Sequence, residues 1–213
     1  MDFCFYLISD RRGTSGDRSI EYVIERAIEG GAKGVLLREK DLPDRELLAL
    51  AQRMRDITSR HKVRLLVSGR IDIALAVGAD GVHIGSSNLP PSVARRLIGI
   101  ERYMAVSTHS LKEAREAQDA GADFITFGPV YHTASKEKYG PPVGIDALKE
   151  VCREIKIPVF ALGGLKPDNA VEALKAGAYG VAVISAVIGT DDPSAAAREF
   201  IDRIRSYKLE RLV

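Results

Sequence analysis

The chain has 213 residues, 46% of them hydrophobic, and a formal net charge of +2 at neutral pH. This length and composition suffice for a buried core, and the small net charge excludes the strong positive field that binding to nucleic acid or to an anionic membrane requires. No apolar run approaches the roughly 20 residues of a membrane span, and no basic leader precedes the first strand-like run. We therefore expect a cytoplasmic protein without nucleic-acid or membrane partners.

Strand-like and helix-like runs alternate along the whole chain, as they do in parallel βαβ units. Between the second and third predicted strands, apolar residues recur at helical spacing with charged residues on the opposite face, which indicates a helix packed on a sheet. This spacing is formed by Leu47, Leu50, Ala51, Met54 and Ile57. The predicted strands are, in chain order, residues 5–9, 34–38, 64–67, 81–84, 103–107, 124–127, 158–162 and 180–185.

A short Gly-Ala phrase occurs four times, beginning at Gly31, Gly78, Gly121 and Gly177. In each copy a helix-like run ends at the glycine, which tolerates the left-handed conformation of a helix C′ position, and an apolar run follows within four residues. The spacing between copies leaves room for two strand–helix units, so the four copies account for eight units. We therefore predict an α/β protein in which residues 1–213 form a single (β/α)8 TIM barrel domain.

The loops that follow the strands of such a barrel carry its chemistry. Glycine lets backbone N–H groups approach phosphate oxygens, and the partial positive charge of a helix N-terminus adds to the attraction. Gly163 and Gly164 after the seventh strand, with the turn at Ser185 after the eighth, therefore predict a phosphate site. On the other loops, the candidate ligand-binding residues are Arg38, Lys40, Ser68 and Ser107.

The loop after the sixth predicted strand is the second candidate region. Thr133, Ser135 and Lys136 combine hydroxyl groups with an ammonium group, which could hold another anionic group of a ligand. His132 carries an imidazole that can give and take a proton near neutral pH. A solvent-facing histidine without a function is the alternative interpretation of His132. On this basis the candidate catalytic residues are His132 and Lys136.

The motifs at the strand ends resemble those of the thiamine phosphate synthase and TenI family over essentially the whole chain. They include Leu37-Arg38-Glu39-Lys40, Gly81-Val82-His83-Ile84-Gly85, Phe127-Gly128-Pro129-Val130 and Leu162-Gly163-Gly164. The resemblance implies a TIM barrel that binds a phosphorylated thiazole and, in the synthase, a pyrimidine diphosphate as well. By the same resemblance, the diphosphate would face Arg38, Lys40, Ser107 and Lys136. The thiazole phosphate would face Thr133, Ser135, Gly164, Ile184 and Ser185.

The chain departs from the synthase pattern at three positions. It has Leu36 where the synthase has a glutamine, and Gly69 and Asn88 where the synthase has the two carboxylates that bind magnesium. Because Mg²⁺ prefers charged oxygen ligands and helps to neutralise a departing diphosphate, these changes predict poor ionisation of the pyrimidine diphosphate. The TenI-type tautomerases resemble this chain in having Gly-Arg after the third strand, but their catalytic histidine corresponds to Pro129, three residues before His132.

These departures favour a metal-independent thiazole tautomerase, an isomerase that moves a double bond of a carboxylated thiazole phosphate by acid–base catalysis. One alternative is a divergent thiamine phosphate synthase, a transferase for which Mg²⁺ would be the cofactor. Another is a barrel that binds thiazole phosphate or thiamine phosphate without catalysis. For the tautomerase we expect no cofactor and no metal ligand. The expected partners are small phosphorylated molecules, and the sequence leaves open whether two copies form a homo-oligomer.

Overall fold

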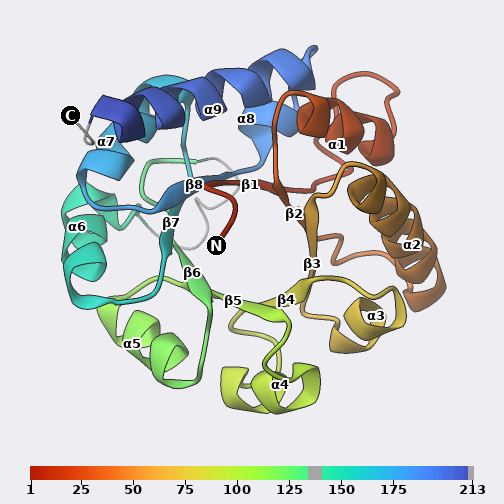
Figure 1. Ribbon diagram of the computed structural model, residues 1–213, viewed down its shortest axis with the longest axis horizontal. Helices are drawn as coiled ribbons and strands as arrows, with labels where there is room; N and C mark the ends of the chain where they lie inside the picture. Colours follow the sequence, from red (N-terminus) through yellow and green to blue (C-terminus); the bar gives the residue numbers. More distant parts are fainter. Residues whose placement is uncertain (134–140, 211–213) are drawn as a thin grey trace.

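The computed structural model describes residues 1–133 and 141–210 and contains a closed parallel β-barrel in the order β1 to β8. Helices surround the barrel and follow its strands around the ring (Figure 1). The strands are β1 (Phe5–Ile8), β2 (Gly34–Leu37), β3 (Arg64–Ser68), β4 (Gly81–Ile84), β5 (Tyr103–Thr108), β6 (Phe124–Phe127), β7 (Val159–Leu162) and β8 (Gly180–Val183). The helices are α1 (Ile20–Glu29), α2 (Asp44–Arg60), α3 (Ile71–Ala76), α4 (Pro91–Ile98), α5 (Leu111–Asp119), α6 (Gly144–Glu154), α7 (Pro167–Lys175), α8 (Ser185–Ile188) and α9 (Pro193–Glu210).

The observed barrel confirms the predicted fold class, and each predicted strand lies within two residues of an observed one. The eighth strand differs at its end, because β8 stops at Val183 and Ser185 is already the first residue of helix α8. Ile184, which precedes this helix as its N-cap, makes no side-chain capping bond. The sequence therefore lacks the polar capping residue that normally marks such a boundary.

The four repeated glycines form the joints between helices and the following strands. Gly31, Gly78, Gly121 and Gly177 all have positive φ, with values of 108°, 61°, 82° and 105°. Each stands two residues after the last residue of its helix, which is the C′ position. The following alanine N–H then donates back into the helix, as at Ala79, which bonds to the carbonyl of Ala74 at 2.8 Å. This confirms the predicted role of the repeated phrase.

Two of these helix–strand connections contain an aspartate whose carboxylate accepts a hydrogen bond from the backbone of the neighbouring strand. Asp80 Oδ2 accepts the backbone N–H of Leu65 at 2.9 Å, and its carboxylate is also paired with Arg55 and Arg64. Asp123 repeats the arrangement, since its Oδ2 accepts the backbone N–H of Met104 at 2.7 Å. Each carboxylate thus satisfies a backbone donor at the start of the preceding strand.

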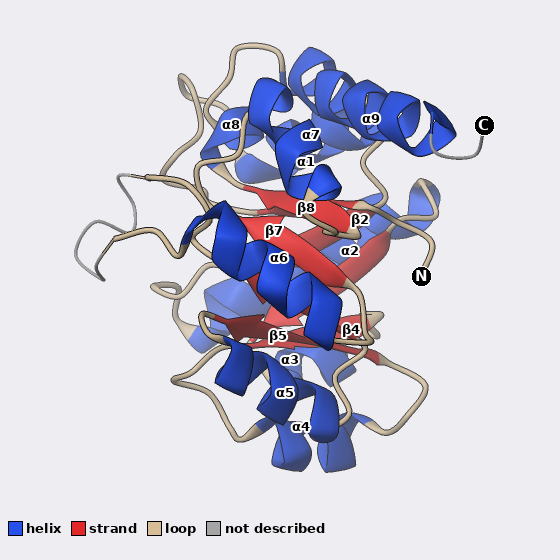
Figure 2. Cartoon of the chain, turned by 90° about the vertical axis from the view of Figure 1, so that its left-hand side faces the viewer, coloured by secondary structure: helices blue, strands red, loops and turns tan. Residues whose placement is uncertain are grey.

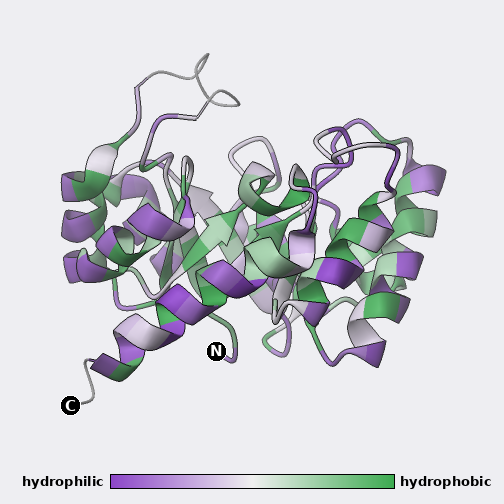
Figure 3. Ribbon diagram, turned by 90° about the horizontal axis from the view of Figure 1, so that it is seen from above, coloured by the Kyte–Doolittle hydropathy of each residue, from purple (hydrophilic) through white to green (hydrophobic). Residues whose placement is uncertain are grey.

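The barrel interior is filled by alternate strand residues, while a second hydrophobic layer packs between the strands and the helices. The amino-terminal end of the barrel is closed by Phe3, whose ring lies against the interior side of Gly34. Figure 3 shows that hydrophilic and hydrophobic residues alternate along the outer helices, whereas the strands of the barrel are largely hydrophobic. The interior cluster consists of Phe3, Tyr6, Ile8, Leu36, Leu66, Ala105, Phe124, Phe160 and Ala182.

Across residues 1–133 and 141–210, no helix is both long enough and apolar enough to span a membrane.

Replacing Asp80 by alanine should lower the free energy of unfolding by about 1–3 kcal/mol at pH 7, because it leaves the Leu65 N–H without its acceptor. Burial opposes ionisation of Asp80, but the Leu65 N–H and the guanidinium groups of Arg55 and Arg64 outweigh it and lower its pKa. The stabilisation is therefore present above the ordinary aspartate pKa of about 3.9 and is lost as the pH falls through the lower folded value.

Urea denaturation of wild type and Asp80→Ala at several pH values measures this difference. The exposed Asp202→Ala variant is the control and should differ little from wild type. A gap between wild type and Asp80→Ala that stays constant down to pH 3 would contradict the assigned role.

Candidate functional site

The carboxyl ends of all eight strands meet at one rim of the barrel, which lies on the left in Figure 2. Because alternate residues of a strand face the same side, the residue two positions after each interior residue also faces inward. Ser68 follows Leu66 in this way, and Ser107 follows Ala105. Arg38 and Ile184 stand at the equivalent positions just past the ends of β2 and β8. The strand register thus brings four of the predicted ligand-binding residues to the same rim.

A buried carboxylate joins the loops after β1 and β2. Glu39 is only 5% exposed, and it accepts hydrogen bonds from Ser9 Oγ at 2.6 Å and from the backbone N–H of Arg11 at 3.1 Å. Burial raises the pKa of Glu39, and these two hydrogen bonds oppose the shift. Ser9 Oγ also accepts the backbone N–H of Arg38 at 2.9 Å, so the same network fixes the base of the Arg38 side chain.

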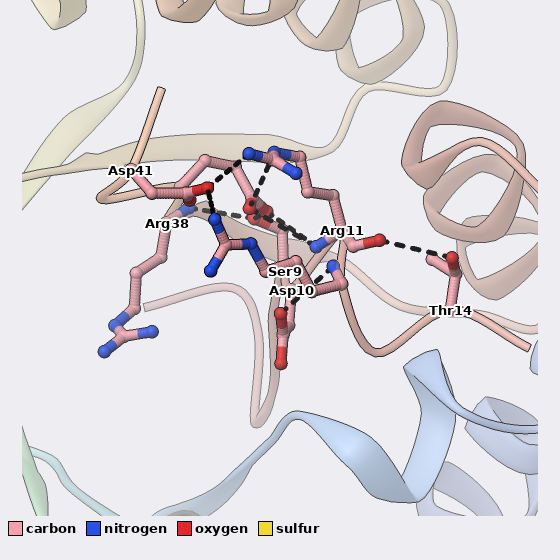
Figure 4. A network of polar contacts seen from close by, with 8 residues as sticks. Ser9, Asp10, Arg11, Thr14, Arg38 and Asp41 are labelled. Carbon is pink, nitrogen blue, oxygen red and sulfur yellow. Dashed lines mark hydrogen bonds and ion pairs between the residues drawn. The ribbon is translucent and has the colours of Figure 1, made fainter. Parts of the chain in front are cut away.

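The Arg38 guanidinium itself extends away from this network (Figure 4). Asp41 pairs with both Arg11 and Arg12, and this closes a second bridge between the two loops. Lys40 is exposed beside them. Arg38 therefore stands free of these carboxylates, and its charge is available to an anionic ligand.

The loops after β3 and β4 meet at Gly69 and Asn88. Gly69 has φ +69°, and a Cβ atom at this position would lie 2.3 Å from Asn88 Nδ2. Asn88 is held there because its Oδ1 accepts the backbone N–H of Gly85 at 2.7 Å. The amide of Asn88 therefore fills the space that a side chain at position 69 would need.

These residues do not fit the magnesium site that the sequence resemblance implies. Gly69 offers no ligand, and the single carbonyl oxygen of the Asn88 amide already accepts a hydrogen bond. The buried carboxylate of this rim, Glu39, is committed to Ser9 and Arg11. Within the described ranges, no three His, Cys, Asp or Glu side chains are grouped so that they could hold a metal ion. The donor set lacks the charged oxygens that Mg²⁺ prefers.

The glycines after β7 sit beneath the loop that follows β6. Gly163 and Gly164 have φ values of 98° and 64°. A Cβ atom on Gly163 would lie 2.5 Å from Pro129 Cβ, and one on Gly164 would lie 2.5 Å from the His132 carbonyl oxygen. The two loops are also joined by the Tyr131 N–H, which donates to the Gly163 carbonyl at 3.1 Å. Glycine is thus required by both backbone conformation and close packing.

The predicted phosphate-binding residues lie at neighbouring strand ends, because β7 and β8 are adjacent in the barrel. Ser185 is exposed at the start of α8, and Ile184 before it is half-buried. This juxtaposition of a glycine turn with a helix start is the arrangement in which barrels commonly bind phosphate.

Of the predicted residues in the loop after β6, the structure describes His132 and Thr133, while Ser135 and Lys136 lie outside the described residues. His132 is exposed and Thr133 is half-buried. The backbone of His132 lies directly over Gly164, so this loop borders the candidate phosphate site. The roles of His132 as a proton carrier and of Lys136 as a catalytic group remain predictions.

Sequence reasoning assigned no role to Tyr6 and named Glu39 and His83 as parts of the family motifs. His83 is 3% exposed and lies inside the barrel, with its Nε2 atom 2.8 Å from Ser107 Oγ. Burial, together with the charges of Arg38 and Lys40, lowers its pKa to about 3, so the ring is neutral. The strict alternation of interior residues in β1 and β4 is the signal that could have identified Tyr6 and His83 as interior polar groups.

The fold and the rim together define a TIM barrel with basic, hydroxyl and glycine residues suited to phosphorylated small molecules. Residues 5–187 match the family described as thiamine monophosphate synthase. The chain belongs to this family, which confirms the sequence-based resemblance. The chain is 55% identical over 201 residues to a protein of Geobacter sulfurreducens named "Putative thiamine-phosphate synthase", and the match covers 94% of each.

Two further relatives extend this comparison. A thiamine-phosphate synthase of Roseiflexus sp. (strain RS-1) is 44% identical over 206 residues, which are 97% of this chain and 87% of the relative. Among solved structures, the thiamine phosphate pyrophosphorylase from Pyrococcus furiosus superposes with a TM-score of 0.87 at 36% identity. That superposition covers 95% of this chain and 96% of the other.

Replacing Gly164 by alanine should weaken phosphate binding and also destabilise the protein, because the new methyl group would collide with the loop after β6. Gly78→Ala is a matched control, since Gly78 has nearly the same φ, +61°, but no atom within 4 Å of the place that a methyl group would take. The left-handed conformation costs an alanine about 1–2 kcal/mol at either site. Only the Gly164 variant should lose more stability than this and bind inorganic phosphate more weakly in calorimetry.

Equal losses of stability and equal phosphate affinities in the two variants would show that packing against the His132 backbone has no role in the site.

Proposed function

We propose that this protein is a thiamine phosphate synthase that joins a pyrimidine diphosphate to a thiazole phosphate. The observation that carries the proposal is the likeness, over nearly the whole chain, to the thiamine phosphate pyrophosphorylase from Pyrococcus furiosus at 36% identity. The names of the other relatives support the same activity. They favour the synthase alternative over the tautomerase that the three sequence departures favoured.

In this reaction a carbon–nitrogen bond forms between the thiazole ring nitrogen and the methylene carbon of the pyrimidine. The carbon–oxygen bond to the diphosphate breaks, and the diphosphate leaves with the electron pair. Arg38 and Lys40 would bind the departing group by charge, and Ser107 would donate a hydrogen bond to it. Gly163, Gly164 and Ser185 would hold the thiazole phosphate at the next part of the rim.

Gly69 and Asn88 affect how this synthase would neutralise the departing diphosphate. Without carboxylates at these positions, neutralisation of the diphosphate would depend on the positive side chains of the rim. Arg38 is suited to this role, because the Ser9 and Glu39 network holds its backbone while its guanidinium remains apart. Fixed charges that face a developing anion need little reorganisation during the reaction.

The direct test is an assay of thiamine phosphate formation from both purified substrates, with and without Mg²⁺. The synthase proposal predicts product, with a smaller dependence on Mg²⁺ than a site with two carboxylates would give. No product under either condition would refute it. Thermal stabilisation by the thiazole phosphate without any turnover would instead support the non-catalytic binder.

The thiazole tautomerase is the second candidate, and the neutral pair of Gly69 and Asn88 favours it, because double-bond migration needs no metal to release a diphosphate. His132 is the exposed imidazole of the loop beside Gly164 and would transfer the proton. Isomerisation of the carboxylated thiazole phosphate by wild type, with a loss of at least tenfold in His132→Gln, is the expected result for this candidate. Unchanged turnover in His132→Gln would remove His132 from the reaction.

Restoring both carboxylates should make thiamine phosphate formation respond more strongly to Mg²⁺. Gly69→Asp and Asn88→Asp are made singly and together. In each variant with Gly69→Asp the side chain at position 88 must move aside, because a Cβ atom at position 69 would lie 2.3 Å from Asn88 Nδ2 in the present structure. Aspartate is among the residues that tolerate the left-handed backbone of position 69. Initial rates over a Mg²⁺ titration compare wild type, the two single variants and the double variant. An equally steep Mg²⁺ dependence in wild type would contradict the role assigned to these positions.

A further inference from the structure

Two buried polar side chains and one half-buried side chain form a chain of hydrogen bonds across the inside of the barrel. Tyr6 of β1 is fully buried, and its hydroxyl lies 3.3 Å from His83 Nδ1. On the other edge of the imidazole, Nε2 lies 2.8 Å from Ser107 Oγ. The rings of Tyr6 and His83 are nearly parallel, with an interplanar angle of 4° and their centroids 5.9 Å apart. The chain therefore leads from the hydrophobic interior to the ligand rim.

The direction of these hydrogen bonds follows from the buried phenol. Burial raises the pKa of Tyr6, so the hydroxyl keeps its proton and needs an acceptor. Among the described residues, the hydrogen-bond partner of this hydroxyl is His83 Nδ1. If Nδ1 carried the imidazole proton, the phenol oxygen would accept that bond, and the buried phenol proton would be left without an acceptor among the described residues. Nδ1 is therefore the acceptor, and the single proton of the neutral ring lies on Nε2.

The surroundings of His83 keep this ring neutral. Its pKa is lowered first by burial and then by the positive charges of Arg38 and Lys40 from the β2 side of the rim. The groups that contact it from the other strands are neutral, namely Tyr6 of β1, Ser107 of β5 and Thr126 of β6. No carboxylate is among these contacts in the described part of the chain.

The Nε2–H group then has two hydroxyl oxygens within reach. Ser107 Oγ is at 2.8 Å and Thr126 Oγ1 at 3.4 Å, so the shorter contact to Ser107 is the stronger. A serine oxygen that accepts this bond still has its own proton to donate. Ser107 is half-buried and faces inward at the carboxyl end of β5, where a ligand would lie.

We propose that Tyr6 and His83 are positioning residues that hold the Ser107 hydroxyl as a hydrogen-bond donor to an anionic oxygen of the bound ligand. The identity of that ligand, a diphosphate, rests on the proposed function, whereas the direction of the hydrogen bonds does not. With the reverse direction, Ser107 would donate to His83 and would present only lone pairs to the ligand, which would repel an anion.

The direction can be measured without any ligand by two-bond ¹H–¹⁵N correlation spectroscopy on protein labelled with ¹⁵N-histidine. The signal of His83 is assigned by replacing His61, His109 and His132 one at a time with glutamine. The expected result is a neutral ring protonated on Nε2 that does not titrate between pH 5 and 8, whereas an ordinary histidine with a pKa of about 6.5 would titrate there. Protonation on Nδ1 would overturn the proposal.

The effect on the ligand is measured by calorimetry with inorganic pyrophosphate as the probe. Tyr6→Phe keeps the aromatic packing but removes the donor to His83, and it should weaken pyrophosphate binding by roughly two- to tenfold. In a Ser107→Ala background the same substitution should have no further effect, because the hydroxyl that it orients is absent. Equal weakening by Tyr6→Phe in both backgrounds would overturn the proposal.

Tyr103→Phe is the matched control, because Tyr103 begins β5 at the other end of the barrel from Ser107 and contacts Phe3 instead. It should leave pyrophosphate binding unchanged. A wild-type protein that fails to bind pyrophosphate would count against the diphosphate ligand of the proposed function, while the histidine spectrum would still decide the direction of the hydrogen bonds.

Discussion

The pairing of β1 with β8 is the contact on which the rest of the structure depends. Phe5 pairs with Val181 and Leu7 with Val183, and this pairing closes a parallel sheet into a barrel. In a closed parallel barrel, all the strands point the same way around a common axis. Arg38 and Ser185, which are far apart in the sequence, therefore belong to one rim. Without the closure, the two halves of the candidate site would not face a common ligand.

The sequence was most informative where a local backbone requirement determined the residue. The glycines at Gly31 and Gly177 could be read as helix ends because few other residues adopt the left-handed conformation. Burial of charge was harder to predict, because it depends on distant partners. Glu39 lies between two cations and looks like a solvated charge in the sequence, yet it is 5% exposed and Ser9, from the loop after β1, donates a hydrogen bond to it. The contact of Asn88 with Gly69 likewise depends on how two loops fold together.

The rim combines two different kinds of electrostatic environment. Arg38 and Lys40 supply positive charge on the β2 side, whereas the β3 and β4 side presents the neutral amide of Asn88 and a glycine. Beneath both, Tyr6 and His83 form a polar but uncharged layer. In the proposed function, anions would thus be attracted by charge and oriented by neutral donors.

The aspartate joints at Asp80 and Asp123 lie at the starts of strands, at the end of the barrel opposite the rim. Energetic effects of residues that share no partners and lie far apart are usually additive. Stabilising substitutions at the end of the barrel that carries Asp80 and Asp123 can therefore offset destabilising changes made in the ligand-binding loops. The two ends of the barrel can thus be engineered independently.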